Sequence, residues 1–444
     1  MTIASTRERS SVMLDAPADW TMRRLGTFAT KVGSGATPRG GKSVYLNSRV
    51  SHALIRSQHV FDRRFDSDEI AFISEEHAQE LRNAEVRPGD ILLNITGDGV
   101  TFARACIVPN HVLPAAVNQH VSIVRVDQNV CAPGYLLGYL THPVTKRYIE
   151  SFNTGGSRRA ITKGHIESFE VPLPPLPVQQ RIAGILSAYD ELIENNLRRT
   201  RILEAMARAF FREWFVNFRF PGHEKRPRVV SPLGDIPQGW EVREMQEVAD
   251  VIDCLHSKKP TECPDATGIF LQLNNVGEAG KLDMREQFRI SAEDYALWTS
   301  RIELRAGDCV ITNVGRVGAV AQIPDGFSAA PGRNMTAIRP RTGRLTPTYL
   351  IEYLLSSHMT SEVAKKKDLG TIMDSLNVKG IIRLHVPCPP MEAMLKFESI
   401  ARPIRKRVEV LTEQSQNLQR TRDLLLPRLL SGQVDVKEIE SSRE

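Results

Sequence analysis

The chain has 444 residues, too many for one ordinary hydrophobic core, and a typical size of ~150 residues per domain suggests about three folding units. Hydrophobic residues make up 41% and charged residues 25% of the chain, which excludes wholesale disorder. The net charge of +6 suits a polyanionic partner but does not identify one, since 52 acidic residues offset 58 basic residues.

The six cysteines lie scattered along the chain, without a Cys-x-x-Cys pair or a nearby histidine pair at zinc-ligand spacing. We therefore expect buried free thiols in a reducing compartment and no metal site. Residues 1–20 contain no apolar signal-peptide core, and no stretch of the chain approaches the ~18 apolar residues that would span a bilayer. These features predict a cytoplasmic protein.

Residues 17–172, which follow an N-terminal extension over 1–16, show the pattern of a mixed α+β domain. An extended segment over 25–32 is followed by a short helix over 74–82, the strand-like segments ILLNI and SIVRV, and a helix over 134–152. Gly-Asp pairs and clusters of Asn and Gly punctuate these segments as turns. The sequence therefore predicts a first globular domain of ~150 residues.

A long helix is predicted over 173–218, after the proline run at 172–177. Prolines are tolerated at a helix start and stiffen the segment before it, so we favour this interpretation over a polyproline ligand. Apolar residues then recur at steps of 3 and 4, as in the a/d seam of a coiled coil: Ile182, Ile185, Tyr189, Leu192, Leu203, Met206 and Phe210. A linker over 219–236 follows this helix.

Residues 237–387 repeat the landmarks of the first domain in the same order. Six pairs of residues mark the repeat: Trp20 and Trp240, Gly89 and Gly307, Asn118 and Asn334, Tyr135 and Tyr349, Lys163 and Lys379, and Pro172 and Pro387. The separation runs from 214 residues for the tyrosines to 220 for the tryptophans, which excludes a short-period solenoid. The repeat predicts a second α+β domain, with helices over 291–300 and 348–367 and a strand at CVITNV.

A second long helix is predicted over 388–434, before a tail over 435–444. Its apolar residues are spaced by sevens: Phe397, Ile404, Leu411, Leu418 and Leu425, supported by Ile400, Val408 and Leu429. Pro403 and Pro427 should kink this helix or mark its ends, because proline lacks the amide donor and clashes with the preceding turn.

The two helical stripes could pack on the protein's own domains or on a second chain. We favour mutual pairing, because the helices alternate with the globular domains along the chain. The predicted fold class is therefore α+β: two globular domains related by pseudo-two-fold symmetry, separated by two long antiparallel coiled-coil helices. About 35 residues at ~1.5 Å per residue would give a rod of ~50 Å, comparable to the ~34 Å repeat of B-DNA.

The motifs of this sequence resemble those of the specificity subunit of type I restriction-modification systems, over nearly the whole chain. The matching segments are Gly33–Pro38 (GSGATP), Arg87–Asp90 with ILLNITG, Asn118–Gln119, Thr154–Ile161 (TGGSRRAI), Pro172–Ile193, and Leu424–Val434 (LLLPRLLSGQV). The second half departs from this pattern: Leu255–Pro260 (LHSKKP) replaces GSGATP, and LGTIMDSLNVKG replaces TGGSRRAITKG. Such divergence is what two different target sequences would require.

The resemblance implies a non-catalytic subunit that recognises a bipartite site in double-stranded DNA through two target-recognition domains. It also implies two methyltransferase subunits docked on the helices, and restriction subunits that join them. S-adenosylmethionine, ATP and Mg would then be bound by those partners, and no cofactor by this chain.

Glycine-rich loops that carry Arg or Lys are suitable for contacts to phosphates and base edges. In the first domain the candidates for DNA binding are Lys31, Arg39, Lys42, Arg158, Arg159 and Lys163. In the second domain they are Lys258, Lys259, Arg316 and Arg333. Each could instead be a solvated surface charge. Asn118, Gln119 and Asn334 could meet adenine edges, but a role in turns and strand ends is favoured.

Two other classes of function have partial support in the sequence. Residues 36–43 (ATPRGGKS) match a loose phosphate-loop pattern, but Pro38 lies inside the loop and the second half lacks the motif. The sequence contains no Asn-Pro-Pro-Tyr or Asp-Pro-Pro-Tyr methyltransferase motif and no convincing nuclease constellation. A coiled-coil scaffold that binds proteins but no defined duplex is the remaining alternative.

Overall fold

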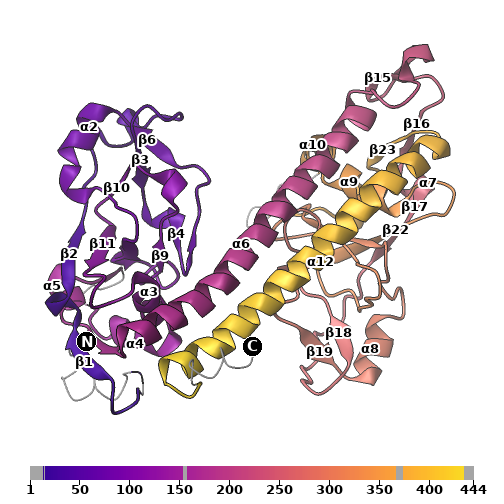
Figure 1. Ribbon diagram of the computed structural model, residues 1–444. Coiled ribbons are helices and arrows are strands. Elements are labelled where there is room, and N and C mark those ends of the chain that lie inside the picture. The colour runs from indigo at the N-terminus through magenta and orange to yellow at the C-terminus, as the bar shows by residue number, and fades with distance from the viewer. Residues whose placement is uncertain (1–13, 15, 154–157, 367–373, 435–444) are drawn as a thin grey trace, which may run out of the picture. The chain divides into compact units, whose positions relative to one another are not determined.

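The computed structural model describes residues 14, 16–153, 158–366 and 374–434. The chain divides into two compact units: unit 1 comprises residues 1–196 and 414–444, and unit 2 comprises residues 197–413. Each unit holds one globular domain and one part of each long helix (Figure 1). The predicted extension, except for residues 14 and 16, and the predicted tail lie outside the described residues.

The domain of unit 1 is built on two sheets that share a buried apolar interior. The larger sheet is antiparallel, in the order β2 (Ala29–Ser34), β11 (Val121–Val126), β7 (Ile91–Asn94), β9 (Ala105–Ile107). The smaller sheet has the order β10 (Ala115–Val117), β3 (His52–Ile55), β6 (Ala71–Ile73), with β10 and β3 parallel. Leu92 and Ile123 of the larger sheet and Ile55 of the smaller one belong to one buried cluster.

Unit 2 repeats the larger sheet strand for strand. The order is β17 (Ala249–Asp253), β22 (Met335–Pro340), β20 (Cys309–Thr312), β21 (Val320–Gln322). A two-stranded ladder also recurs, as β1 (Thr21–Arg24) with β13 (Glu170–Leu173), and as β16 (Glu241–Glu244) with β23 (His385–Cys388). The duplicated α+β domain predicted from the sequence is therefore confirmed.

Shorter elements complete the two domains. In unit 1 they are β4 (Val60–Phe61), β5 (Arg64–Phe65), α2 (Glu75–Glu80), β8 (Thr96–Gly97), β12 (Arg159–Ala160) and α5 (Lys163–Glu167). In unit 2 they are β14 (Arg228–Ser231), β15 (Gly234–Pro237), α7 (Met245–Val248), β18 (Gly268–Phe270), β19 (Phe288–Ile290), α8 (Ala292–Trp298) and α11 (Val378–Ile382). The short helices expected over 74–82 and 291–300 are α2 and α8, each capped by a serine hydroxyl that accepts a backbone N–H.

A buried carboxylate explains why the Arg-x-Gly-Asp turn occurs twice. Asp90 is 0% exposed and accepts the Arg87 backbone N–H at 2.7 Å and the Arg125 guanidinium at 2.7 Å. In unit 2, Asp308 makes the same bonds with the Arg305 backbone and the Arg339 guanidinium. The glycine before each aspartate has a φ near +85°, which side-chain-bearing residues rarely adopt (+84° for Gly89, +87° for Gly307).

The paired tyrosines fasten a helix to the ladder in each domain. In α3 (Pro133–Thr141) the hydroxyls of Tyr135 and Tyr139 donate to the carbonyl oxygens of residues 172 and 170 in β13. In α9 (Pro347–Leu354) the hydroxyls of Tyr349 and Tyr353 donate to the carbonyls of residues 387 and 385 in β23. Buried phenols require such partners, so the repeat preserves both members of each bond.

The single helix expected over 134–152 is two helices, α3 and α4 (Pro143–Glu150). The break has a local cause, because Pro143 cannot donate to the preceding turn and His142, in an extended conformation, accepts the Val144 N–H instead. The helix expected over 348–367 is likewise two helices, α9 and α10 (Ser357–Lys366), and Ser356 accepts the Met359 N–H between them.

Two long helices run through both units: α6 (Leu176–Phe211), with a π-turn over 212–216, and α12 (Met391–Leu430) (Figure 1). α12 is continuous through Pro403 and Pro427, so Pro403 does not mark an end of the helix, whereas Pro427 lies three residues before its last residue, Leu430. The predicted kinks stay predictions. Each proline is flanked by buried apolar residues, Ala401 and Val408 around the first and Leu426 and Leu429 around the second. Burial of this face offsets the lost amide donors.

After Ile182, the buried seam of α6 is shifted by one residue along the helix from the predicted seam. Leu192 is 52% exposed and Met206 is 43% exposed, although both were assigned to the seam. The buried positions are Gln179, Ile182, Leu186, Ile193, Thr200, Ala207 and Phe211. In α12, Phe397 and Leu411 are fully buried as predicted, whereas Ile400 is 37% exposed.

The helices pack on each other within each unit. In unit 1, Ile182 and Leu186 from the start of α6 share a cluster with Leu426 and Leu429 from the end of α12. In unit 2, Phe211 from the end of α6 contacts the ring of Phe397 from the start of α12, with 6.1 Å between centroids. The beginning of each helix meets the end of the other, so the pairing is antiparallel, as predicted. Among the described residues, no helix is long and apolar enough to cross a membrane.

Candidate nucleic-acid interface

One end of the larger sheet of unit 1 gathers the motifs singled out in the sequence. Ser34 at the end of β2 lies opposite Ser122, and Asn94 at the end of β7 lies opposite Val121 at the start of β11. The segments that leave or enter these strands therefore emerge together. We call residues 35–42, 96–104, 118–120 and 158–160 sheet end 1.

Hydrogen bonds join these four segments. Thr37 Oγ1 donates to Gln119 Oε1 at 2.6 Å, and Thr96 Oγ1 lies 2.7 Å from His120 Nδ1. β12 pairs with β8, which brings Arg159 opposite Gly97. GSGATP, ITGDG, Asn118–Gln119 and the described end of TGGSRRAI thus form one surface, although residues 154–157 of the last motif lie outside the described residues.

Close backbone approach accounts for the glycine at the start of sheet end 1. A Cβ on Gly35 would lie 1.7 Å from the carbonyl oxygen of Val117, and the Gly35 N–H donates to the Asn118 carbonyl at 3.2 Å. Only glycine fits this approach. The loop that follows β8 is ordered by Asp98, whose carboxylate accepts the Thr101 N–H and hydroxyl, each at 2.7 Å. These bonds hold the pKa of Asp98 below its usual range.

The candidate cations of sheet end 1 differ in whether they already bond to other groups of the protein. The side chain of Arg39 is 92% exposed, with Glu80 at 3.9 Å, and Lys42 and Arg158 are exposed. Arg159 donates to Glu150 at 2.7 Å and lies 3.5 Å from the Gly99 carbonyl. Burial and the charge of Arg158 lower the pKa of His120.

The other two candidates of the first domain make contacts of their own. Lys31 lies within β2, and its ammonium donates to the Asn83 carbonyl at 2.5 Å; burial and the neighbouring Arg125 lower its pKa. Lys163 lies in α5, 3.5 Å from Glu167 one turn later. DNA contact by all six candidates of the first domain stays a prediction.

Unit 2 presents the equivalent end of its sheet. Asp253 at the end of β17 lies opposite Thr336, and Thr312 at the end of β20 lies opposite Met335 at the start of β22. We call residues 254–260, 313–318, 332–334 and 374–376 sheet end 2. Asn313 joins two of these segments, since its side chain donates to the Leu376 carbonyl at 2.8 Å.

The candidate cations of the second domain also divide into two kinds. Lys258 and Arg333 are exposed. Lys259 donates to Gln272 at 2.8 Å and lies 4.0 Å from the centroid of the Phe288 ring. Arg316 donates to the carbonyl of Val276 at 2.9 Å, so its guanidinium supports a neighbouring loop.

The sequence did not single out every polar group at these surfaces. His120, which the sequence analysis did not single out, lies within sheet end 1, and its position directly after Asn118–Gln119 was the available signal. Arg104 lies with its guanidinium 4.5 Å from the centroid of the Phe61 ring. Asn313 has no counterpart in the first half, where Ile95 occupies the equivalent position, so the repeat could not reveal it.

One group of potential metal donors lies at sheet end 2, where none was predicted. Asp253, Cys254 and His256 place one donor atom each within 4.8 Å of one another, and His256 Nε2 lies 2.8 Å from Asp253 Oδ2. The group offers three donors, all from one short segment, whereas structural zinc sites use four. Burial raises the pKa of the Cys254 thiol, which disfavours the thiolate that zinc requires.

The phosphate-loop alternative lacks its structural context in unit 1. Residues 36–43 lead into a 3-10 turn over Gly41–Val44, with Gly40 at a φ of +93°. A phosphate loop must open an α-helix whose first amides face the phosphates. The described segment therefore gives no support to nucleotide binding at Lys42.

Comparisons with known proteins agree with the arrangement of these domains. Residues 17–204 match the family model described as the type I restriction modification DNA specificity domain. The chain is 20% identical to the putative type I restriction enzyme MjaX specificity subunit of Methanocaldococcus jannaschii, over 95% of each chain. It is also 20% identical to the type I restriction enzyme HindI specificity subunit of Haemophilus influenzae, over 94% of this chain and 100% of that one.

A solved structure shows the same fold. The type I restriction-modification system S subunit from M. genitalium superposes with a TM-score of 0.61 at 13% identity, over 94% of this chain and 99% of that one. The relatives are named as specificity subunits, the non-catalytic part of type I restriction enzymes, which is the class that the sequence predicted.

Proposed function

We propose that this chain is a specificity subunit of a type I restriction-modification system and that its two domains read the two parts of a bipartite DNA site. Sheet end 1 would read one part and sheet end 2 the other. Exposed cations such as Arg39, Lys42 and Arg158 would meet phosphates, and neighbouring polar side chains would meet base edges.

The observation that carries the proposal is a contrast between what the two halves share and where they differ. The Asp90 and Asp308 turns and the paired tyrosines recur with the same hydrogen bonds, so the scaffold of the two domains is alike. The sheet ends differ in sequence, with GSGATP in one and LHSKKP in the other. Divergence at one end of a shared scaffold is expected of two domains that bind different sequences.

We further propose that methyltransferase subunits dock on the long helices. Large apolar side chains are exposed along them: Leu192, Ile202 and Met206 on α6, and Leu395 and Leu424 on α12, each between 43% and 62% exposed. Exposed apolar surface of this kind is typical of protein interfaces. Restriction subunits would join this complex, and S-adenosylmethionine, ATP and Mg would bind to those partners in the cytoplasm.

The experiment uses the chain purified together with its modification subunits. Selection from a random duplex library should enrich one motif with two specified parts separated by unspecified bases. A variant with Arg39, Lys42 and Arg158 all changed to alanine should bind the selected duplex more weakly, with a smaller salt dependence. Enrichment of no motif would contradict the proposal, and a scaffold without DNA specificity would then be favoured.

A further inference from the structure

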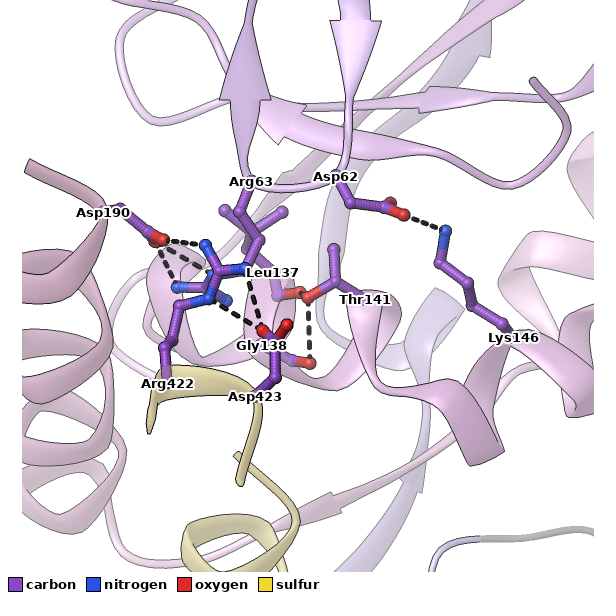
Figure 2. A network of polar contacts seen from close by, with 9 residues as sticks. All are labelled: Asp62, Arg63, Leu137, Gly138, Thr141, Lys146, Asp190, Arg422 and Asp423. Atoms are coloured by element: carbon purple, nitrogen blue, oxygen red, sulfur yellow. Dashed lines mark hydrogen bonds and ion pairs between the residues drawn. The ribbon is translucent and has the colours of Figure 1, made fainter. Parts of the chain in front are cut away.

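A shared carboxylate joins the domain of unit 1 to both helices (Figure 2). Arg63, in the turn between β4 and β5, donates through Nε and Nη2 to Asp190 Oδ2 of α6, at 2.9 and 2.6 Å. Arg422 of α12 donates to the other oxygen of Asp190 at 2.7 Å. The side chains are 4%, 18% and 15% exposed, so all three charges are largely removed from water.

Residues of α3 and α4 lie beside the turn that carries Arg63. Asp62, the preceding residue of the turn, is ion-paired with Lys146 of α4. A Cβ on Gly138 of α3 would lie 3.7 Å from Nη1 of Arg63, so this position of α3 lies beside the guanidinium (Figure 2). That Nη1 is buried without a hydrogen-bond partner among the described residues, which makes the guanidinium dependent on Asp190.

Unit 2 has an ion pair in the corresponding place. Arg405 of α12 donates through Nη1 to Glu352 of α9 at 2.8 Å, and through Nη2 to the Gly280 carbonyl at 3.3 Å. The side chain of Glu352 is 2% exposed and that of Arg405 is 14% exposed. Burial raises the pKa of Glu352 and Arg405 opposes the rise. In this unit the carboxylate belongs to the domain and the guanidinium to the helix.

The helix positions of the two pairs are equivalent in the repeat. Asp190 lies 18 residues after Pro172, and Arg405 lies 18 residues after Pro387, its partner in the repeat. Each is on the first half of its long helix, in the unit of the domain that precedes that helix. The same position therefore carries a negative charge on α6 and a positive charge on α12.

The domain residues that face Asp190 and Arg405 also differ between the two units. Gly138 and Glu352 each lie three residues after a paired tyrosine, Tyr135 or Tyr349. The small residue of unit 1 lies beside a cation, and the large residue of unit 2 supplies an anion.

A third pair of equivalent positions, in a turn of each domain, also differs between the units. Arg63 and Gly280 each lie 11 residues before a helix-capping serine, Ser74 or Ser291. Both have a positive φ, +59° for Arg63 and +74° for Gly280. A Cβ on Gly280 would lie 2.9 to 3.0 Å from the side chains of Ile351 and Leu355, so a larger residue would require these side chains to shift. Three equivalent positions thus differ in charge and size in a mutually compensating way.

From this pattern we propose that Asp190 and Arg405 are positioning residues of opposite charge, each orienting only its own recognition domain on the helix segments of its unit. A carboxylate domain partner such as Glu352 would be repelled by Asp190, and Arg63 would be repelled by Arg405. The inference rests on the proposed function, because the orientation of each domain would select the number of base pairs between the two parts of the target.

The test measures binding of the complex with modification subunits to duplexes that contain both selected half-sites. The spacer is lengthened or shortened by one base pair while the half-sites are kept. For Asp190→Asn we expect the affinity ratio between the preferred spacer and its neighbours to fall about tenfold, which corresponds to about 1.4 kcal/mol. The base preferences within each half-site should not change. A residue that merely stabilises the fold would lower binding to every duplex alike.

Three further variants keep the test interpretable. Asp190→Glu retains the charge and should retain spacer discrimination. Glu191→Gln removes a neighbouring exposed carboxylate of α6 and should also retain it. The double variant Glu352→Gln with Arg405→Gln leaves no buried charge unpaired, so it avoids the main cause of unfolding. It should lose spacer discrimination as Asp190→Asn does.

Two results would overturn different claims. If the unaltered complex selects no duplex, the proposed function fails. If the unaltered complex is selective, but Asp190→Asn and the Glu352/Arg405 double variant both keep its spacer discrimination, the proposed function stands and the positioning role is wrong. If Asp190→Asn binds no duplex, the double variant alone decides in the same way.

Discussion

The contact that we expect Arg158 to make with a DNA phosphate has a measurable signature in salt. Arg158 is exposed at sheet end 1, beside His120 and next to a residue paired with β8. Each phosphate neutralised on duplex DNA contributes a slope of about 0.9 to the fall of log K with log salt. Arg158→Ala should therefore lower the magnitude of that slope by about 0.9. Between 50 and 200 mM salt, the ratio of unaltered to variant affinity should shrink by about threefold.

The assay is a salt titration of binding to the selected duplex, with the chain in complex with its modification subunits. Arg285→Ala is the matched control, because this exposed arginine is paired with Asp283 and lies outside both sheet ends and both long helices. We expect its slope to equal that of the unaltered complex. An unchanged slope for Arg158→Ala would refute the phosphate contact. A loss confined to one base position at constant slope would show that Arg158 contacts a base edge instead.

Three other predictions concern stability, and chemical denaturation measures each of them. Asp90→Asn should lower the unfolding free energy of unit 1 by about 3 kcal/mol, because it leaves the Arg125 guanidinium without its carboxylate. Asp308→Asn should lower that of unit 2 by a similar amount, because Arg339 loses its carboxylate in the same way. Equal loss from both unfolding transitions in either variant would argue against two separate units. Tyr349→Phe should cost unit 2 about 1 to 2 kcal/mol, since the Pro387 carbonyl loses its donor, and no change would mean that water replaces the phenol. Burial lowers the pKa of His59 from 6.5 to about 4. Unit 1 should therefore lose stability as the pH falls from about 6.5 to about 4, because the unfolded chain binds the proton more readily. His59→Gln should remove that part of the pH dependence.

The coiled-coil stripe shows how far periodicity alone can predict packing. The apolar residues of α6 form a stripe wider than the buried seam, so steps of 3 and 4 from Ile182 fit two registers. The predicted register included Leu192, whereas the structure buries Ile193. The facing side chains of α12 and of the globular domains decide between these registers, and the sequence of α6 contains no record of them. The apolar residues left outside are the exposed ones that we assign to docking.

The candidate site could be predicted as a set of motifs but not as a surface. Repetition and glycine-rich loops indicated residues 35–42 and 118–120, and the strand register was needed to bring them together. The sequence also could not separate exposed cations from engaged ones. Arg316 bonds to the carbonyl of Val276, 40 residues earlier, and Lys31 bonds to that of Asn83, 52 residues later. Such contacts depend on tertiary folding and have no local signature.

The most direct test of two sheet ends that read two half-sites is methylation mapping of DNA from cells that express this chain with its modification subunits. The account predicts one modified motif, with two specified parts at a fixed spacing. Replacing residues 35–42 with the corresponding loop of a relative of different specificity should alter one part and leave the other part and the spacing unchanged. A continuous motif, or a change in both parts, would contradict the account.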